Sequence, residues 1–306
     1  MTVQGVSSAS GNIYDLGYRG YDGPRLGRIT VARGLLRQTL KEAYGIGRGG
    51  RAKIAPFVLL GLAVFPAVLA VAFQALAAQA GAGAEFEQQL PIRHDTYQGA
   101  VSLFVMLFVA AQAPELFGRD LRYGVLPLYF SRVLTRIDYA LARTGGLFLA
   151  ILIVTLVPQL LLSVGTVLAA PDPVTGLTKD LPQIPRYLAV SLLESGVYCG
   201  VGAVVAAYTP RRAYSVAAII ALFIVPPIVV GIFSAMSVGD TARILQLMSP
   251  GDVVDGVNSA IFGAIDIGNG TVFVAALPSW VYVATAAVYV VGSLAIVVRR
   301  YLTVSV

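Results

Sequence analysis

Six apolar runs, each long enough to cross a lipid bilayer as a helix, constrain this chain more than any other feature of its sequence. About 20 consecutive apolar residues span the hydrocarbon core in helical form. Only 12% of the residues are charged, which is about half of the share typical of soluble domains. The sequence therefore predicts an all-α integral membrane protein with six transmembrane helices. We expect these spans at about residues 54–78, 97–117, 141–169, 187–208, 213–236 and 277–298.

The distribution of basic residues predicts the orientation of these spans. Six spans place both termini on one side, and eighteen of the 22 Lys and Arg residues fall on that side. The other side keeps only Arg93, Lys179, Arg186 and Arg243, together with nine of the 16 acidic residues. Because basic loops stay in the cytoplasm, we expect cytoplasmic N- and C-termini in a multi-pass protein of the plasma membrane. The net charge of +6 then reflects topology, and no nucleic-acid partner is expected.

The sequence divides into a cytoplasmic segment (1–53), the transmembrane domain (54–298) and a short cytoplasmic tail (299–306). The first 27 residues contain no apolar stretch of the kind found in signal peptides, so we expect no cleavable leader. Residues 28–44, RITVARGLLRQTLKEAY, have apolar residues at roughly helical spacing and basic residues between them. They predict an amphipathic helix at the inner membrane interface. A simple membrane anchor and a contact with a partner are both compatible with it.

The connection at residues 237–276 contains two stretches with helical character, Ala242–Met248 and Val253–Phe262. We predict short outer helices before the last span. They either pack at or dip into the outer leaflet, where protein must cover irregular backbone, or belong to a plain extracellular loop.

Motifs of catalysis and nucleotide binding are absent from the sequence. No G-x-x-x-x-G-K-[ST], H-E-x-x-H or G-x-S-x-G occurs, and the first of these is the phosphate-binding loop of many ATPases. The single histidine, His94, is interpreted as an interfacial polar residue, and the single cysteine, Cys199, excludes an internal disulfide. We therefore expect no enzyme activity and no cofactor bound by this chain.

Glu194 is the one ionisable residue deep inside a predicted span, with Tyr198 one turn away on the same helix. Such residues are costly in a membrane and often functional. Two readings stay open: a place in a substrate pathway, or a carboxyl group satisfied at a contact between helices. On the same span, Gly196 and Gly200 form a G-x-x-x-G step, which permits close helix packing and points weakly to a subunit interface.

The charged connection between the second and third spans carries the functional prediction. Residues 115–140 place an apolar group among arginines, and Thr135 followed by Asp138 predicts the start of the third helix. Aromatic residues beside arginine are typical of interface cores, although the apolar group could instead dip into the lipid headgroups. The candidate interface residues are Arg119, Arg122, Leu126, Leu128, Tyr129, Phe130 and Arg132.

Two stretches of the chain resemble ABC-2 type permease subunits, particularly the actinobacterial kind. They are APELFGRDLRYGVLPLYFSRVLTRIDY at 113–139 and YDLGYRGYDGPRLGR at 14–28, and the six-span layout extends the resemblance over nearly the whole chain. Val133 departs from the proline expected in the first stretch. The resemblance implies that two permease subunits, identical or related, form the pore. It also implies that each subunit docks a separate ABC ATP-binding subunit, which carries ATP and Mg, through a coupling helix within 117–131.

The resemblance further implies an exporter, and the sequence fits a hydrophobic or amphipathic substrate. A membrane-embedded enzyme is one alternative, and it would require acids and histidines gathered on inward helix faces. An accessory or structural membrane subunit without an ATPase partner is the other, and it would have no need of the loop at 117–131.

Overall fold

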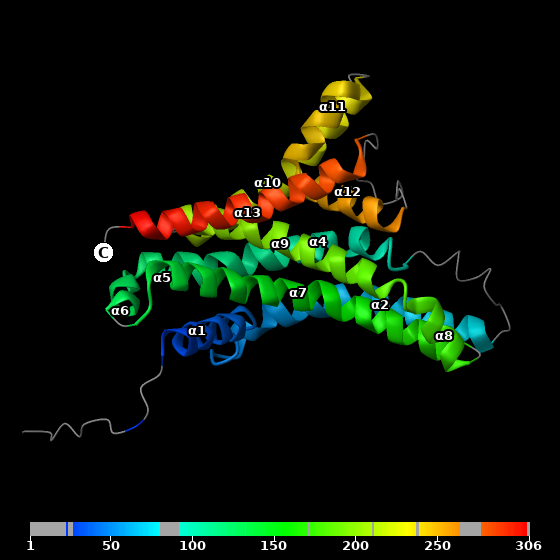
Figure 1. The fold of residues 1–306 in the computed structure, drawn as a ribbon, viewed down its shortest axis with the longest axis horizontal. Helices are drawn as coiled ribbons and strands as arrows, with labels where there is room; N and C mark the ends of the chain where they lie inside the picture. The colour runs from blue at the N-terminus through cyan, green and yellow to red at the C-terminus, as the bar shows by residue number, and fades with distance from the viewer. Residues whose placement is uncertain are drawn as a thin grey trace, which may run out of the picture.

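Long helices make up the structure, and no strand occurs in the residues that it describes (Figure 1). The computed structural model describes residues 23, 27–79, 92–131, 133–170, 172–209, 211–236, 239–263 and 277–304. The helical elements are α1 (Arg28–Ala43), α2 (Arg51–Gln79), α4 (Tyr97–Ala113), the π-helical turn η1 (Pro114–Gly118), α5 (Arg119–Arg122), α6 (Leu126–Phe130), α7 (Arg136–Ala169), α8 (Pro173–Asp180), α9 (Ile184–Tyr208), α10 (Arg212–Ala235), α11 (Gly239–Leu245), the 3-10 turn η2 (Gln246–Met248), α12 (Pro250–Phe262) and α13 (Ser279–Thr303).

Six of these helices are long and apolar enough to cross a membrane, which confirms the six predicted spans. They are α2, the continuous unit α4–η1–α5, α7, α9, α10 and α13. The third span, α7, begins at Arg136, well before its apolar run, as the pair of Thr135 and Asp138 predicted. Its 34 residues span about 50 Å, which exceeds the thickness of a bilayer core. The chain therefore has the architecture of a multi-pass membrane protein.

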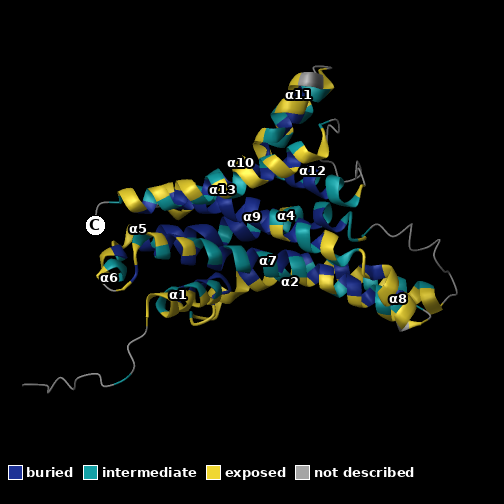
Figure 2. Ribbon diagram, in the orientation of Figure 1, coloured by how far each residue is buried: buried dark blue, intermediate teal, exposed yellow. Residues whose placement is uncertain are grey.

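The six helices form a bundle with a buried centre (Figure 2), and many large apolar side chains of α2, α10 and α13 are exposed. In the most apolar stretch of α9, 67% of the residues are buried, whereas the figure is 17% for both α10 and α13. Apolar side chains that face outward in this way suit lipid, because a helix satisfies its backbone internally and needs no water. The core of the bundle is therefore made mainly by α4, α7 and α9.

Helix α1 lies beside the first turns of α7 and runs in the same direction. Leu36 and Thr39 face Gly145 and Gly146, where an added Cβ would lie 3.2 Å and 2.5 Å from their side chains. The Tyr44 hydroxyl then donates to the carbonyl oxygen of Ala150 over 2.8 Å. The helix predicted at 28–44 is thus present, and its placement at a membrane surface stays a prediction.

The G-x-x-x-G step of α9 packs against α13 of the same chain. A Cβ on Gly196 would lie 2.8 Å from Val290, and one on Gly200 would contact Ser293. Close packing is therefore confirmed, but its partner is a helix within the chain, so these two glycines no longer point to a subunit interface. The helices α11 and α12 occupy the connection before the last span, as predicted, and Gly256 of α12 lies against the ring of Tyr282.

Candidate functional site

The predicted coupling segment forms a short crossing between two long helices at one end of the bundle (Figure 1). The π-helical turn η1 and the single turn α5 end the first helix. Gly124 adopts a φ of 62°, a left-handed conformation that glycine accepts without steric cost. The chain then forms α6, and α7 begins with a capping box in which Thr135 and Asp138 each bond the other's backbone nitrogen. The crossing is thus bounded by two local stop and start signals.

A buried ion-pair cluster ties this crossing to α1 and α7. Arg143 of α7 is 1% exposed, donates to Glu42 of α1 over 2.7 Å, and also donates to Asp120 of α5. The Tyr139 hydroxyl donates to the same carboxylate of Asp120 over 2.7 Å. Charges buried in this way are stable only when paired and hydrogen-bonded. The cluster therefore fixes α1, α5 and α7 in one arrangement.

Glu42 lies at the centre of the charge balance in this cluster. Burial by itself would raise the pKa of Glu42, but the charge and the hydrogen bond of Arg143 lower it below its ordinary value. The guanidinium of Arg119 adds to this effect at 3.7 Å from the carboxylate. Glu42 is therefore ionised at neutral pH, and Arg119 is oriented toward α1 rather than toward solvent alone.

A second acid, Glu115, connects η1 to two further parts of the bundle. Its carboxylate lies 3.2 Å from Arg48, in the turn between α1 and α2, and 2.6 Å from Arg212 at the start of α10. These pairs are partly exposed, so each contributes little to stability. Their geometry nevertheless joins the start of the crossing to α10.

The apolar residues of α6 divide between the inside and the outside of the protein. Leu126 is buried, and the rings of Tyr129 and Phe130 lie 5.2 Å and 5.9 Å from the ring of Tyr139. Burial and the nearby Asp120 raise the pKa of Tyr129. Leu128, by contrast, is 69% exposed. Three of the four predicted apolar contacts thus anchor α6 to its own chain.

The exposed surface of the crossing contains fewer residues than the predicted interface, and not all of them are the predicted ones. Arg122 is exposed, and its guanidinium lies 5.0 Å from the ring centre of Tyr123, which is 66% exposed. Together with Leu128 these residues form what we call the α5–α6 surface. Arg132 lies outside the described residues. Sequence reasoning missed Tyr123 as a surface residue, although its position directly after Arg122 offered a signal.

Sequence reasoning also missed the three members of the buried ion-pair cluster. Asp120 and Arg143 both belong to the charged stretch, but the sequence does not indicate that their side chains meet. Glu42 belongs to a separate helix, and the sequence does not indicate its contact with Arg143 either. One signal was present: Tyr139 and Arg143 are four residues apart and so share a helix face.

The predicted pathway residues Glu194 and Tyr198 lie in the core of the bundle. Glu194 is 3% exposed, and its Oε1 atom has no hydrogen-bond partner among the described residues. The ring of Tyr198 stacks on Phe223 at 4.4 Å. A part in a substrate pathway stays a prediction for both.

The described residues contain no group of three or more His, Cys, Asp or Glu side chains placed to hold a metal ion. Comparison with protein-family models and with curated proteins finds no match for this chain. The functional argument therefore rests on the geometry of the site and on the sequence patterns.

Proposed function

We propose that this chain is the permease subunit of an ABC-2 type transporter, and that a separate ATP-binding subunit docks on the α5–α6 surface. The observation that carries the proposal is a small exposed surface on a firmly anchored support. Arg122, Tyr123 and Leu128 face outward, while Asp120 and Leu126 beside them are buried. Aromatic and arginine side chains of this kind dominate binding energy at protein interfaces.

The anchoring of this surface gives it a means of transmitting force. A push on α5 is passed to α7 and α1 through the contacts of Asp120, Arg143 and Glu42. A second route leads from Glu115 to Arg212 of α10. Packed elements of this type move as discrete units rather than deforming continuously. Nucleotide-driven movement of the partner would therefore tilt several spans together.

The proposal includes the finer expectations from the sequence. Both termini and the α5–α6 surface lie in the cytoplasm, in keeping with the excess of Lys and Arg at that end. Two permease subunits form the pore in the plasma membrane, and the ATP and Mg belong to the partner chains. A hydrophobic or amphipathic substrate, exported from the cell, fits spans in which Glu194 is the one acid of the described residues that lies away from the helix ends.

A gentle detergent purification from cells that naturally make the protein tests this proposal. We expect a protein with a Walker A motif to co-purify, and its yield to fall at least about tenfold with Leu128→Asp or Arg122→Glu. Leu177→Asp is the matched control, because Leu177 is a half-exposed leucine on α8 at the opposite end. The proposal is wrong if no such protein is recovered, or if the Leu128 and Arg122 variants retain it as well as the control does.

A further inference from the structure

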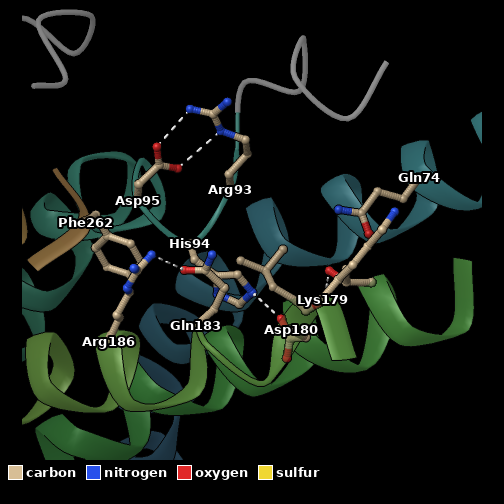
Figure 3. A pocket seen from close by; sticks show the side chains of 11 residues that line it. Gln74, Arg93, His94, Asp95, Lys179, Asp180, Gln183, Arg186 and Phe262 are labelled. Carbon is tan, nitrogen blue, oxygen red and sulfur yellow. Dashed lines mark hydrogen bonds and ion pairs between the residues drawn. The ribbon is translucent and has the colours of Figure 1, made fainter. Parts of the chain in front are cut away.

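A second polar site lies at the end of the bundle opposite the α5–α6 surface. It is a pocket of about 380 Å³, a volume within the range of small-molecule sites. Side chains from α2, α7, α8, α9 and α12 line it, together with the turn that precedes α4 (Figure 3). The pocket is thus built where several segments distant in sequence converge.

One wall of the pocket is a fixed polar cluster around His94. The Nδ1 atom of His94 lies 2.6 Å from Oε1 of Gln159, and the Gln159 amide nitrogen donates back to the His94 carbonyl oxygen over 3.3 Å. The imidazole ring stacks on Tyr187 at 5.0 Å. Its Nε2 atom lies 3.3 Å from Oδ1 of Asp180, which is 3% exposed. The side chain expected at an interface is therefore held in place from three directions.

The charge around the pocket is unusual for this end of the molecule. Only four Lys and Arg residues fall on this side of the predicted spans, and Arg93, Lys179 and Arg186 line the one pocket. Arg93 is paired with Asp95 through contacts of 2.8 Å and 3.2 Å. Lys179 and Arg186 form no ion pair with any residue that the structure describes. Arg186 donates to the Gln183 amide oxygen over 3.5 Å, so no described carboxylate neutralises either cation.

An unsatisfied acceptor atom accompanies these cations. The Oε1 atom of Gln74 is buried without a hydrogen-bond partner among the described residues. Buried polar atoms normally have partners. A hydroxyl group of a ligand would supply the missing donor.

From these features we infer that the pocket binds a hydroxyl-bearing phosphate ester. Its phosphate oxygens accept from Lys179 in charge-assisted hydrogen bonds, a hydroxyl group donates to the neighbouring Gln74, and Arg186 adds positive charge at the other side of the pocket (Figure 3). This chemistry occurs both in free glycerol phosphate and in the glycerol phosphate headgroup of an anionic phospholipid. Leu76 and Leu168 follow the lining residues Gln74 and Thr166 by two positions and are 61% and 75% exposed, so a lipid bound at the pocket would have exposed apolar side chains near it. The inference is independent of the proposed docking of an ATPase.

Binding measurements on the purified full chain test the inference. The probes are glycerol 3-phosphate, measured by calorimetry, and nanodiscs of phosphatidylglycerol or phosphatidylcholine, with retained lipid identified by native mass spectrometry. We expect saturable binding of the phosphate ester, retention of phosphatidylglycerol over phosphatidylcholine, or both. Binding of the free ester alone identifies a soluble ligand, and retention of the lipid alone identifies a headgroup site.

Matched variants separate this pocket from general surface charge. The double variant Lys179→Gln, Arg186→Gln should weaken binding at least about tenfold. Arg243→Gln, which removes a charge from the same side but outside the pocket lining, should leave the Kd within about twofold. Gln74→Leu should weaken glycerol 3-phosphate binding more than methyl phosphate binding, because only glycerol 3-phosphate carries a carbon-bound hydroxyl donor. The inference is overturned if neither probe binds, or if Arg243→Gln weakens binding as much as the double variant does.

Discussion

Arg143 is the residue at which three segments of the chain meet. Its guanidinium contacts the carboxylates of Glu42 and Asp120, and the Tyr139 ring lies 5.6 Å below it. Removing one partner from a buried ion pair leaves an uncompensated charge, whereas replacing every member by neutral groups can cost little. The stability of this end of the protein should therefore depend strongly on the completeness of the cluster.

Arg143→Met should lower the free energy of unfolding by about 3–5 kcal/mol, because it strands two buried carboxylates. Thermal and denaturant unfolding in detergent would measure the effect. Arg37→Met, on the exposed side of α1, is the control and should change stability by less than about 0.5 kcal/mol. Adding Glu42→Gln and Asp120→Asn to Arg143→Met should recover part of the loss. An Arg143→Met protein as stable as the control would contradict this account.

The raised pKa of Asp252 in α12 and the lowered pKa of Glu42 make the folding stability depend on pH with opposite signs. Burial raises the pKa of Asp252 to about 6 despite a hydrogen bond with Ser249. An unfolded aspartate ionises near pH 4, so the folded protein loses stability as the pH rises from about 4 to about 6. Glu42, whose pKa is lowered, contributes stability above the unfolded glutamate pKa and loses it as the pH falls through the folded value.

Asp252→Asn should therefore stabilise the protein by about 2 kcal/mol at pH 7.5 and by much less at pH 4. Melting curves across that pH range would measure the difference. Asp172→Asn provides a control, because Asp172 is an exposed N-cap whose acceptor role asparagine can take over. A gain that does not change with pH would rule out ionisation of Asp252 as its cause.

At the scale of single elements, α1 shows how a correct helix prediction can miss the contacts of the helix. The range predicted from spacing, 28–44, agrees with Arg28–Ala43. The buried residues, however, are Leu35, Thr39, Glu42 and Ala43, while Ile29 is 67% exposed. The reason is that α1 packs on glycines of α7, which admit the Thr39 side chain. The sequence of α1 alone carries no information about that partner.

Substitution by alanine should have opposite effects on stability at two glycines, Gly34 inside α1 and Gly45 just after it. Gly34→Ala should stabilise the protein by about 0.5–1 kcal/mol, since Gly34 is inside the helix and an added Cβ meets no atom within 4 Å. Gly45→Ala should destabilise it, because Gly45 has a φ of 66° and its Cβ would lie 2.5 Å from the Ala52 carbonyl oxygen. Unfolding measurements on both variants provide the check. The same sign of effect in the two variants would refute the local explanation.

The crossing between α5 and α7 was predicted more completely than its contacts. The helix start at Thr135 follows from local chemistry, and the structure confirms it. The division of α6 into an inner side with Leu126 and an outer side with Leu128 could not be predicted. It depends on where Tyr139 and Tyr301, 5.1 Å apart, place the aromatic core.

At the scale of the whole molecule, the charge distribution predicts which end of the bundle faces the cytoplasm. The start of α1 and the end of α13 lie at the same end, because Arg28 binds Asp138 and Arg136 donates to the Leu302 carbonyl oxygen. Basic residues gather at this end, and basic segments are retained on the cytoplasmic side. This prediction places the pocket at His94 on the outer side of the membrane.

Single cysteines can test this orientation, because Cys199 is the chain's one cysteine and is buried. In a Cys199→Ala background, Thr178→Cys on α8 should react with a membrane-impermeant maleimide in intact cells. Leu302→Cys, at the end of α13, should react only after permeabilisation. Both sites are exposed in the structure, so a reversed pattern would invert the proposed topology.

The sequence by itself determined the number of spans, their approximate limits and the helix start at Thr135. These properties depend on local hydrophobicity and capping, which neighbouring residues specify. Only the tertiary structure decided that Arg143 meets Glu42 and Asp120, and that Arg93, Lys179 and Arg186 share one pocket with His94. These groupings join residues up to about a hundred positions apart, and packing between helices sets such distances. The hydrophobic pattern of a helix predicts that the helix is buried or faces lipid, but it does not predict which other helix packs against it.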